Sequence, residues 1–328
     1  MLASLSHVGR LSCGLSFLSV TLSLETSYRT FALSVSKTSA LELLEQLSLV
    51  LGTPVSPDMV RFCEVFQKEL AHFSEVGIRL NPPGLVTMTL GPGSRFGEAV
   101  GCFLRDELHF EDDVVDEVLG LQRSIDDWML VRFLSEPLGE AELGLYFRRT
   151  MSVARAIEWL AARGVSSGER AALAHLGRLL GASRTGVLAA RMARDAPTLY
   201  KVYLHAPSTE GRSSCKALEP VFEYFQFPKK MWKPLVSGLD AMGSRGPGDL
   251  FVSLTLGDGD QIQAIKLDIF QVNLHALEGV LRSAGLLSQE GLSPVNIATE
   301  LGLATAEHCG IALTPTSCTL TAYFVNRS

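Results

Sequence analysis

Six basic residues of this 328-residue chain recur where alternating apolar and polar side chains predict β-strands. They are Arg79, Arg132, Arg148, Arg191, Lys201 and Lys266. If they share one confined space, each close pair of cations repels by about 1 kcal/mol or more, even with good screening. A multiply charged anion relieves that repulsion, because arginine offers bidentate contacts to phosphate oxygens and lysine a mobile point charge. The pattern predicts a site for such an anion, unless each cation pairs with a nearby carboxylate or reaches solvent.

Aromatic residues are interleaved with these cations. They are Trp128, Tyr146, Tyr203, Phe270 and Tyr323. The face of an aromatic ring stabilises a cation by about 0.5 to 2 kcal/mol. Cations that hold a diphosphate leaving group, beside rings that shield an allyl cation from water, are what the ionisation of an allylic diphosphate requires. The alternative interpretation is that the rings only line a barrel.

Three further residues of the same strands could transfer protons. Asp268 and Glu142 are candidates for a general base, although either could instead pair with a neighbouring arginine or lysine. We expect His205 to be the one histidine on the same face, where it could donate to phosphate or shuttle a proton. The histidines and cysteines show no metal-ligand spacing, and no Ser nucleophile elbow or Cys-His pairing is found.

The segment from Phe251 to Phe270 shows how such residues are positioned. It predicts two strands joined by a tight two-residue turn at Asp258-Gly259. The second strand alternates between an apolar face, with Ile265, Leu267 and Ile269, and a face with Lys266, Asp268 and Phe270. Charges in the middle of a strand imply that something polar faces them.

Turn signals of this kind recur at intervals of 55 to 63 residues. They lie near Thr26 and at residues 82–84, 137–139, 196–197, 258–259 and 315–316. Two amphipathic helices are expected between successive hairpins. The expected helices are 39–51, 57–73, 95–104, 112–121, 153–163, 167–180, 215–225, 229–239, 274–284 and 294–301. A ββαα unit repeated at about 57 residues, with a first hairpin at about 15–35, predicts one domain over residues 1–328.

The fold class that follows is α+β: a closed antiparallel barrel of 10–12 strands ringed by about ten helices. The apolar face of each hairpin should pack outward against the helices. The expected outward residues are Ile78, Leu80, Val86, Met88, Met129, Val131, Phe133, Leu143, Leu145, Phe147, Val202, Leu204, Leu320 and Phe324. The cations and rings then line a lumen, and a barrel this wide leaves a cavity.

The strands that read Lys201-Val202-Tyr203 and Tyr146-Phe147-Arg148, set in repeated ββαα units, resemble the aromatic prenyltransferases of the PT-barrel, or ABBA, fold. The rhythm covers about residues 15–324. The resemblance implies transfer of a dimethylallyl or geranyl group from its diphosphate to an aromatic acceptor, such as an indole or phenol of secondary metabolism, by electrophilic substitution. It places Arg79, Arg132, Arg148, Lys201 and Lys266 on the diphosphate, and Tyr146, Tyr203 and Tyr323 around the allyl group. Residue chemistry adds Arg191 and His205 to the first group, and Trp128 and Phe270 to the second.

The chain departs from that family in two ways. The family is usually built on five repeats, whereas the turn signals count six hairpins around five helix pairs. The acidic residue that commonly accepts the acceptor's proton has no assigned position here. Family members also differ in their use of Mg²⁺, and no ligand cluster stands out on the inner face, so no cofactor is assigned and Mg²⁺ is left open.

Composition bounds the class of protein. The chain is 47% hydrophobic with a net charge of −6, which argues against general affinity for nucleic acid or anionic membrane. Six scattered cysteines without a CxxC favour free thiols in a reducing compartment. The apolar stretch after Arg10 resembles a short signal peptide, but its alternating serines and threonines favour a strand. We expect a soluble cytoplasmic monomer or homodimer.

Two other motifs have a simpler interpretation. Residues 112–116 spell DDxxD, which binds Mg²⁺ and diphosphate in all-helical isoprenoid synthases, yet an acidic first turn of a helix explains them better. The glycines of residues 91–97 could bind phosphate, but they lack the spacing of a nucleotide loop, so a plain loop is favoured. Two rival functions follow: an all-helical synthase, and a non-catalytic barrel that binds an amphipathic anion.

Overall fold

The structure is a computed structural model. It describes residues 39–52, 54–72, 74–81, 83–90, 97–123, 129–135, 141–147, 150–194, 196–206, 208–209, 212–213, 215–241, 250–257, 259, 262, 264–270, 273–287, 293–300, 308–314 and 316–326. The expected first hairpin, the apolar stretch after Arg10 and the glycines of residues 91–96 lie outside these ranges.

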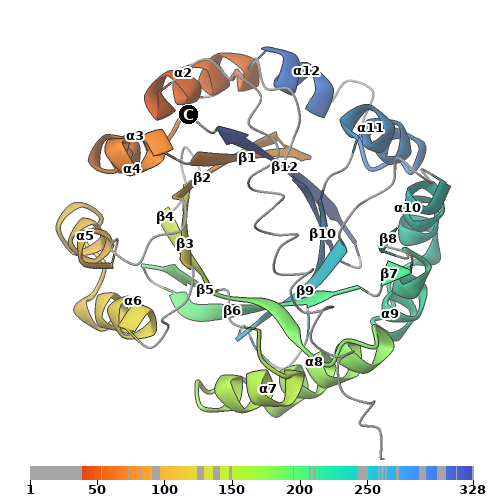
Figure 1. The fold of residues 1–328 in the computed structure, drawn as a ribbon. Coiled ribbons are helices and arrows are strands. Elements are labelled where there is room, and N and C mark those ends of the chain that lie inside the picture. Colours follow the sequence, from red (N-terminus) through yellow and green to blue (C-terminus); the bar gives the residue numbers. More distant parts are fainter. Residues whose placement is uncertain are drawn as a thin grey trace, which may run out of the picture.

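Ten antiparallel strands form a closed barrel (Figure 1). They are β1 (Ser74–Asn81), β2 (Pro83–Leu90), β3 (Met129–Ser135), β4 (Ala141–Phe147), β5 (Thr185–Ala193), β6 (Ala196–His205), β9 (Leu250–Leu256), β10 (Ile265–Phe270), β11 (His308–Leu313) and β12 (Cys318–Asn326). Their order around the barrel is β1-β12-β11-β10-β9-β6-β5-β4-β3-β2, so the pairing of β1 with β12 closes it. The expected range of strand number is confirmed at its lower end. A separate two-stranded sheet joins β7 (Ser208–Thr209) to β8 (Arg212–Ser213).

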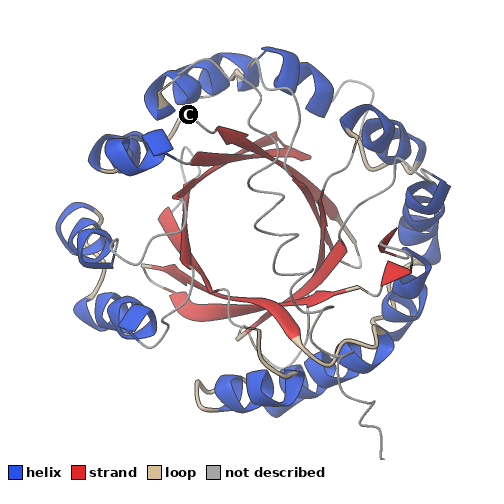
Figure 2. Cartoon of the chain, in the orientation of Figure 1, coloured by secondary structure: helices blue, strands red, loops and turns tan. Residues whose placement is uncertain are grey.

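Helices surround the barrel on its outside (Figure 2). They are α2 (Ala40–Leu51), α3 (Pro57–Val65), α4 (Gln67–His72), α5 (Gly97–Cys102), α6 (Asp112–Arg123), α7 (Val153–Ala161), α8 (Ser167–Leu179), α9 (Glu219–Tyr224), α10 (Lys229–Ala241), α11 (Leu274–Ser283) and α12 (Pro294–Glu300). A π-helical turn (Phe103–Glu107) follows α5, and a 3-10 turn (Cys215–Leu218) precedes α9. The alternation of hairpins with helix pairs is confirmed, which excludes the all-helical rival.

Two of these helices begin at a local signal that the sequence carries. At α2, Ser39 Oγ accepts from the backbone N–H of Glu42 at 3.2 Å, and the Glu42 side chain accepts from the Ser39 N–H at 2.7 Å. Ser166 and Glu169 make the same reciprocal pair at the start of α8. Each pair satisfies two backbone N–H groups that a helix start otherwise leaves unpaired.

The hydrophobic core lies between the barrel and the helices. All the expected outward residues whose side chains the structure describes are buried there; the side chains of Val86 and Met129 lie outside the description. Phe133 on the outer face of β3 stacks on Phe62 of α3, with ring centroids 4.7 Å apart. Phe103 of the π-helical turn packs edge-on against both rings. The apolar face of the barrel therefore points outward, as alternation predicts.

Two expected turns lie elsewhere. Strand β9 ends at Leu256 and β10 begins at Ile265, and the register pairs Leu254 with Ile265, so the loop is too long for a two-residue turn at Asp258-Gly259. Among the described residues of this loop, Gly257 and Gly259 have positive φ, 106° and 124°, and the Gly257 N–H donates to Glu169 Oε1 of α8 at 2.7 Å. The turn expected at 196–197 comes earlier, because β6 already begins at Ala196.

Helix boundaries differ in three places, one of them 215–225, where a 3-10 turn over Cys215–Leu218 precedes α9. The single helix expected over 57–73 is split at Phe66 into α3 and α4, and the one over 95–104 becomes α5 and the π-helical turn. Both regions pack the phenylalanine cluster against β3. Burial of those rings therefore overrides the regular helical period there.

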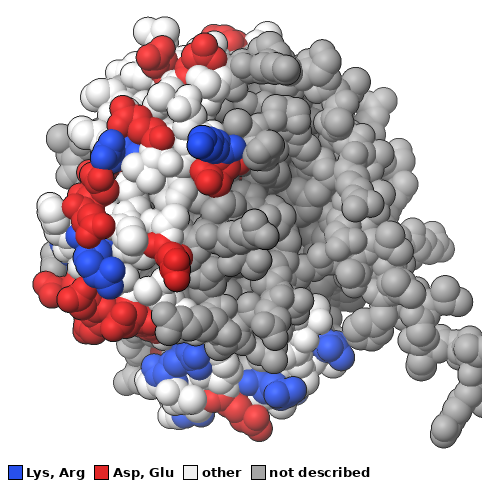
Figure 3. All heavy atoms as spheres, turned by 60° about the vertical axis from the view of Figure 1, so that its left-hand side comes forward, with Lys and Arg blue, Asp and Glu red and all other residues white. Residues whose placement is uncertain are grey.

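The DDxxD motif lies on the outside of the molecule. Asp112 and Asp113 begin α6, and Asp112 pairs with Arg105 at 2.8 Å. On the side of the molecule shown in Figure 3, acidic and basic side chains lie next to one another. Also on the surface, Arg61 contacts Glu107 at 2.6 Å. The helix-start interpretation is confirmed, because Asp112 and Asp113 lie in the first turn of α6. Among the described residues, no helix has both the length and the apolarity to cross a bilayer.

Candidate functional site in the barrel lumen

Strand register brings residues from distant hairpins into one row on the inner face. Glu75 pairs with Thr89, Thr89 with Arg132, Arg132 with Gly144, and Gly144 with Arg191. These residues come from β1 to β5 and are separated by up to 116 positions of sequence (75 to 191). Because each side chain alternates with an outward apolar neighbour, the row faces the lumen.

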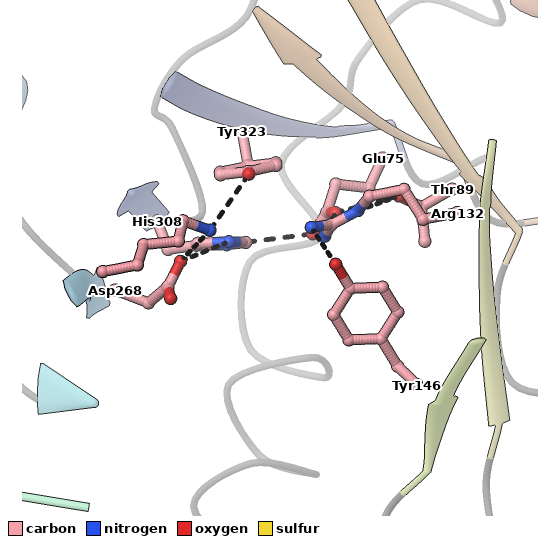
Figure 4. Close-up of polar contacts among 8 residues, drawn as sticks. Glu75, Thr89, Arg132, Tyr146, Asp268, His308 and Tyr323 are labelled. Carbon is pink, nitrogen blue, oxygen red and sulfur yellow. Dashed lines mark hydrogen bonds and ion pairs between the residues drawn. The ribbon is translucent and has the colours of Figure 1, made fainter. Parts of the chain in front are cut away.

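Arg132 is the centre of this row (Figure 4). Its Nη2 contacts Glu75 Oε1 at 2.5 Å, its Nε donates to Thr89 Oγ1 at 3.0 Å, and its Nη1 donates to the Tyr146 hydroxyl at 3.1 Å. Thr89 Oγ1 in turn donates to Glu75 Oε1 at 3.1 Å. Burial alone would lower the pKa of Arg132, but Tyr146 and Glu75 raise it well above its usual value. The guanidinium is a permanent charge.

Two tyrosine rings enclose that guanidinium. The Arg132 Cζ lies 4.6 Å from the ring centroid of Tyr146 and 4.6 Å from that of Tyr323. Tyr203 lies beyond Tyr146, with 6.2 Å between ring centroids. The three tyrosines expected around an allyl cation therefore gather in the lumen, and two of them already stabilise a positive charge.

A second cluster forms around Lys266. Its Nζ contacts Asp268 Oδ1 at 2.6 Å and donates to the Tyr323 hydroxyl at 3.2 Å. Burial acts to lower the pKa of Lys266, but Asp268 and Tyr323 raise it above its usual value. Gly310 on the adjacent strand β11 leaves the room for this lysine: a Cβ there would lie 2.4 Å from Lys266 Cε. The lysine is held charged beside a buried carboxylate.

Lys201 differs from the other cations of the lumen. No carboxylate among the described residues forms an ion pair with it. Burial, together with repulsion from Lys266 and Arg191, lowers the pKa of Lys201 to about 8. The same positive charges act on Tyr146. Burial raises the pKa of Tyr146, but Arg132, Lys201 and Lys266 lower it to about 8.

The other predicted cations have mixed outcomes. Arg191 pairs with Glu142, so one candidate base is occupied by one candidate diphosphate ligand. Arg79 is half-buried on β1, two residues along the same face from Gly77. Arg148 and Trp128 lie outside the described residues. The alternative in which a cation pairs with a nearby carboxylate thus holds for Arg132, Arg191 and Lys266, and their predicted contact with diphosphate stays a prediction.

His205 is not the one histidine of the lumen, although its expected role toward phosphate or a proton stays a prediction. His205 packs edge-on against Phe251, with centroids 5.0 Å apart. A second histidine, His308, lies between Phe270 and Tyr323, parallel to both, with centroids 4.6 and 4.1 Å away. Alternation with Gly310 and Ala312 marks His308 as inward-facing. The alternation is hard to read from the sequence, because Gly310 and Ala312 on the inner face are neither clearly polar nor clearly apolar.

Glu75 is the other residue that sequence reasoning missed. It lies four residues before Arg79 on the same strand face, which is the signal that could have identified it. Its side chain is only 2% exposed. The predicted bases Asp268 and Glu142 are both ion-paired, so the buried carboxylates of the lumen serve first to neutralise its cations. In the described ranges, no three His, Cys, Asp or Glu side chains are grouped to hold a metal ion.

Comparison with protein-family models and with curated proteins found no match. Comparison with solved structures found many chains with the same arrangement of strands and helices. One is 6-dimethylallyltryptophan synthase from Micromonospora olivasterospora in complex with DMASPP and Trp: TM-score 0.59, 14% identity, 89% of this chain and 97% of that chain covered.

Two others extend the comparison. AnaPT from Neosartorya fischeri has a TM-score of 0.60 at 11% identity and covers 92% of this chain and 96% of its own. 5-Dimethylallyltryptophan synthase from Streptomyces coelicolor has a TM-score of 0.55 at 14% identity, with 88% and 98% covered. At such identities the likeness concerns the fold. The closed ten-stranded barrel, its outer helices and these neighbours together show that the chain has the PT-barrel fold of the aromatic prenyltransferases.

Proposed function

We propose that the protein is an aromatic prenyltransferase that moves a dimethylallyl or geranyl group from its diphosphate to an aromatic acceptor such as an indole or phenol. The observation that carries the proposal is the lumen, where the unpaired Lys201 and the ion-paired Lys266 lie beside Tyr146, Tyr203 and Tyr323. Structures of the same fold have been solved with L-tryptophan and dimethylallyl thiolodiphosphate, in PriB, and with brevianamide F and DMSPP, in NotF.

In this proposal the diphosphate binds first to Lys201. Lys201 has no carboxylate partner among the described residues, and a trianionic ligand would relieve its repulsion with Arg191 and Lys266. Charge-assisted contacts to phosphate oxygens are among the stronger hydrogen bonds in proteins. Arg191 and Lys266 then have to share their charge between the ligand and their carboxylates.

The tyrosines would act on the carbon end of the donor. Cleavage of the allylic C–O bond leaves its electron pair on the diphosphate and a positive charge on the allyl group. Tyr146 and Tyr323 already enclose one delocalised cation, the guanidinium of Arg132, at 4.6 Å. The same ring faces can stabilise a second cation nearby, and burial keeps water from it.

The test is direct. The full-length protein is incubated with dimethylallyl or geranyl diphosphate, each with a panel of indoles and phenols, and both diphosphate release and prenylated product are measured. Acceptor-dependent diphosphate release together with a prenylated product supports the proposal. Saturable binding of a donor without any release over the whole panel contradicts it.

One observation favours a second function, a non-catalytic barrel that binds an amphipathic anion. Arg132, Arg191 and Lys266 are neutralised within the lumen, so fewer charges remain to stabilise a leaving group than six free cations would supply. Such a protein should bind the thiolo-diphosphate analogue and the true donor equally well, and both should remain bound and intact over time. Turnover of the true donor excludes it.

A further inference from the structure

His308 connects the two charged clusters of the lumen. Its Nδ1 lies 3.8 Å from Glu75 Oε2, in the Arg132 cluster, and its Nε2 lies 3.9 Å from Asp268 Oδ1, in the Lys266 cluster. Figure 4 shows the ring between these carboxylates, with a contact to each side. Both distances exceed a normal hydrogen bond, so neither nitrogen is held by a carboxylate in this state.

The surroundings of His308 hold its ring in place but leave its Nδ1 without a hydrogen-bond partner among the described residues. Phe270 and Tyr323 cover its two faces at interplanar angles of 17° and 11°. Its Nδ1 is enclosed and has no hydrogen-bond partner among the described residues, and the same holds for Asp268 Oδ2. Unpaired polar atoms in such a buried place are costly. A structural histidine would be expected to have its nitrogens bonded.

The charges around the ring keep it neutral at rest. Burial lowers the pKa of His308 well below its usual value, and the positive charges of Lys266 on β10 and Arg132 on β3 lower it further. The negative groups that face it are Glu75 of β1 and Asp268 of β10, and Tyr323 of β12 covers one face. A neutral imidazole can accept a proton, and the carboxylates of Glu75 and Asp268 lie close enough to stabilise the imidazolium that forms.

We propose that His308 is a catalytic base that takes up the proton lost by the aromatic acceptor, with Glu75 and Asp268 stabilising the imidazolium. The inference rests on the proposed prenyl transfer. In the step, the new C–C bond forms from the ring π electrons. The C–H bond at the same carbon then returns its electron pair to the ring, and the proton moves to Nε2. Nδ1–H faces Glu75, so the enclosed nitrogen keeps its proton throughout.

The step needs no oxidant or reductant, because the allyl group replaces a proton on the acceptor. The diphosphate leaves with the electron pair of the C–O bond, and the proton on His308 balances the charge. After product release the proton passes to solvent or to the departing diphosphate. Arenium ions are strong acids, so a base of low pKa is sufficient.

The experiment compares His308→Gln and His308→Phe with the unmodified enzyme and with His175→Gln. His175 stacks on Tyr224 outside the barrel and has no part in the site. The donor is dimethylallyl diphosphate, and the acceptor is the best substrate of the panel, with hydrogen or deuterium at the carbon that is prenylated. Product, prenyl alcohol and diphosphate are measured separately, and circular dichroism and thermal unfolding check each fold.

We expect both His308 variants to form about 100- to 10,000-fold less prenylated product. Diphosphate should still be released, and the allyl group should then appear as prenyl alcohol. We also expect a deuterium isotope effect that the unmodified enzyme lacks, because proton loss becomes limiting. His308→Phe retains the stacked ring, so a loss of product there is not a loss of packing. His175→Gln should match the unmodified enzyme. Wild-type product rates in either folded His308 variant, or parallel loss of product and diphosphate release, overturn the proposal.

A measurement on the unmodified protein covers the case in which neither variant folds. The ¹⁵N resonances of His308 should report a neutral imidazole at pH 7, and an imidazolium there overturns the proposal. This readout is independent of turnover. If the unmodified enzyme turns over no donor, the proposed function fails. If it is active and the variants match it, only the role of His308 fails.

Discussion

At the scale of single residues, the lumen is a set of buried charges that largely neutralise one another. Arg132 pairs with Glu75 across 57 positions of sequence, and Arg191 pairs with Glu142 across 49. Alternation within a strand predicts which residues face inward, and it placed Lys201 and Tyr203 there. It contains no information on which inward residues of different hairpins meet. The ion pairs therefore could not be predicted, although the face could.

Lys201 gives the first prediction. Replacing it with methionine removes the cation that lacks a carboxylate partner, and one charged hydrogen bond contributes about 1.5 to 3 kcal/mol. We expect the Kd for inorganic diphosphate to rise about 10- to 150-fold, measured by calorimetry. Lys216, which is exposed, provides a matched control as Lys216→Met, for which the Kd should not change. Equal affinity in both variants would contradict the role of Lys201.

The pH dependence of anion binding follows from the same group. Lys201 is charged below its pKa of about 8 and neutral above it, whereas Tyr146 is neutral below about 8 and negative above it. Both changes remove positive charge as pH rises. We expect affinity for inorganic diphosphate to fall between pH 7 and pH 9, and the fall to shrink in Lys201→Met. Affinity that rises over this range would show that another group controls binding.

Asp268 provides a prediction with two readouts. In Asp268→Asn the shape is kept, but Lys266 loses the carboxylate 2.6 Å away. We expect tighter binding of inorganic diphosphate, by about tenfold, because one charged contact is freed for the ligand. Because Asp268 also stabilises the imidazolium in the step proposed for His308, kcat should fall although the donor binds better. Unaltered turnover would remove Asp268 from the list of bases.

At the scale of elements, the repeat was the strongest signal, and loop geometry was the weakest. Paired turn signals and helix patterns predicted the hairpins and their outward faces. The two-residue turn expected after β9 does not form, and the loop there contacts another unit through the hydrogen bond from the Gly257 N–H to Glu169 at the start of α8. A dipeptide such as Asp258-Gly259 favours a turn locally, but it cannot outweigh a buried hydrogen bond from another unit.

Glu169 therefore both caps α8 and binds the loop after β9, and a comparison with a residue that only caps a helix can separate these two contributions. It is 2% exposed, caps α8 and accepts from the Gly257 N–H. We expect Glu169→Ala to lower the free energy of unfolding by about 2 to 4 kcal/mol, since a cap and a buried hydrogen bond are both lost. Glu42→Ala, at the exposed capping box of α2, should cost about 1 kcal/mol. Denaturant titrations measure both, and equal losses would mean that the loop contact adds nothing.

At the scale of the whole molecule, the barrel gathers Arg132, Arg191, Lys201 and Lys266 in its lumen while the net charge of the chain is −6. The sequence predicts this arrangement, because the strands have an apolar outer face and a polar inner face. What the sequence could not provide is the shape of the lumen, which depends on Gly310 and Gly77 leaving room for Lys266 and the Tyr323 ring.

The seam between β1 and β12 has a consequence for how the protein is made. The first and last of the ten barrel strands pair with each other. One edge of β1 therefore stays unpaired during synthesis until β12 has left the ribosome. Open edges invite pairing with other chains. Nascent molecules stalled before residue 318 should thus need a chaperone that covers β1 and β11, and release of the last nine strand residues should end that need.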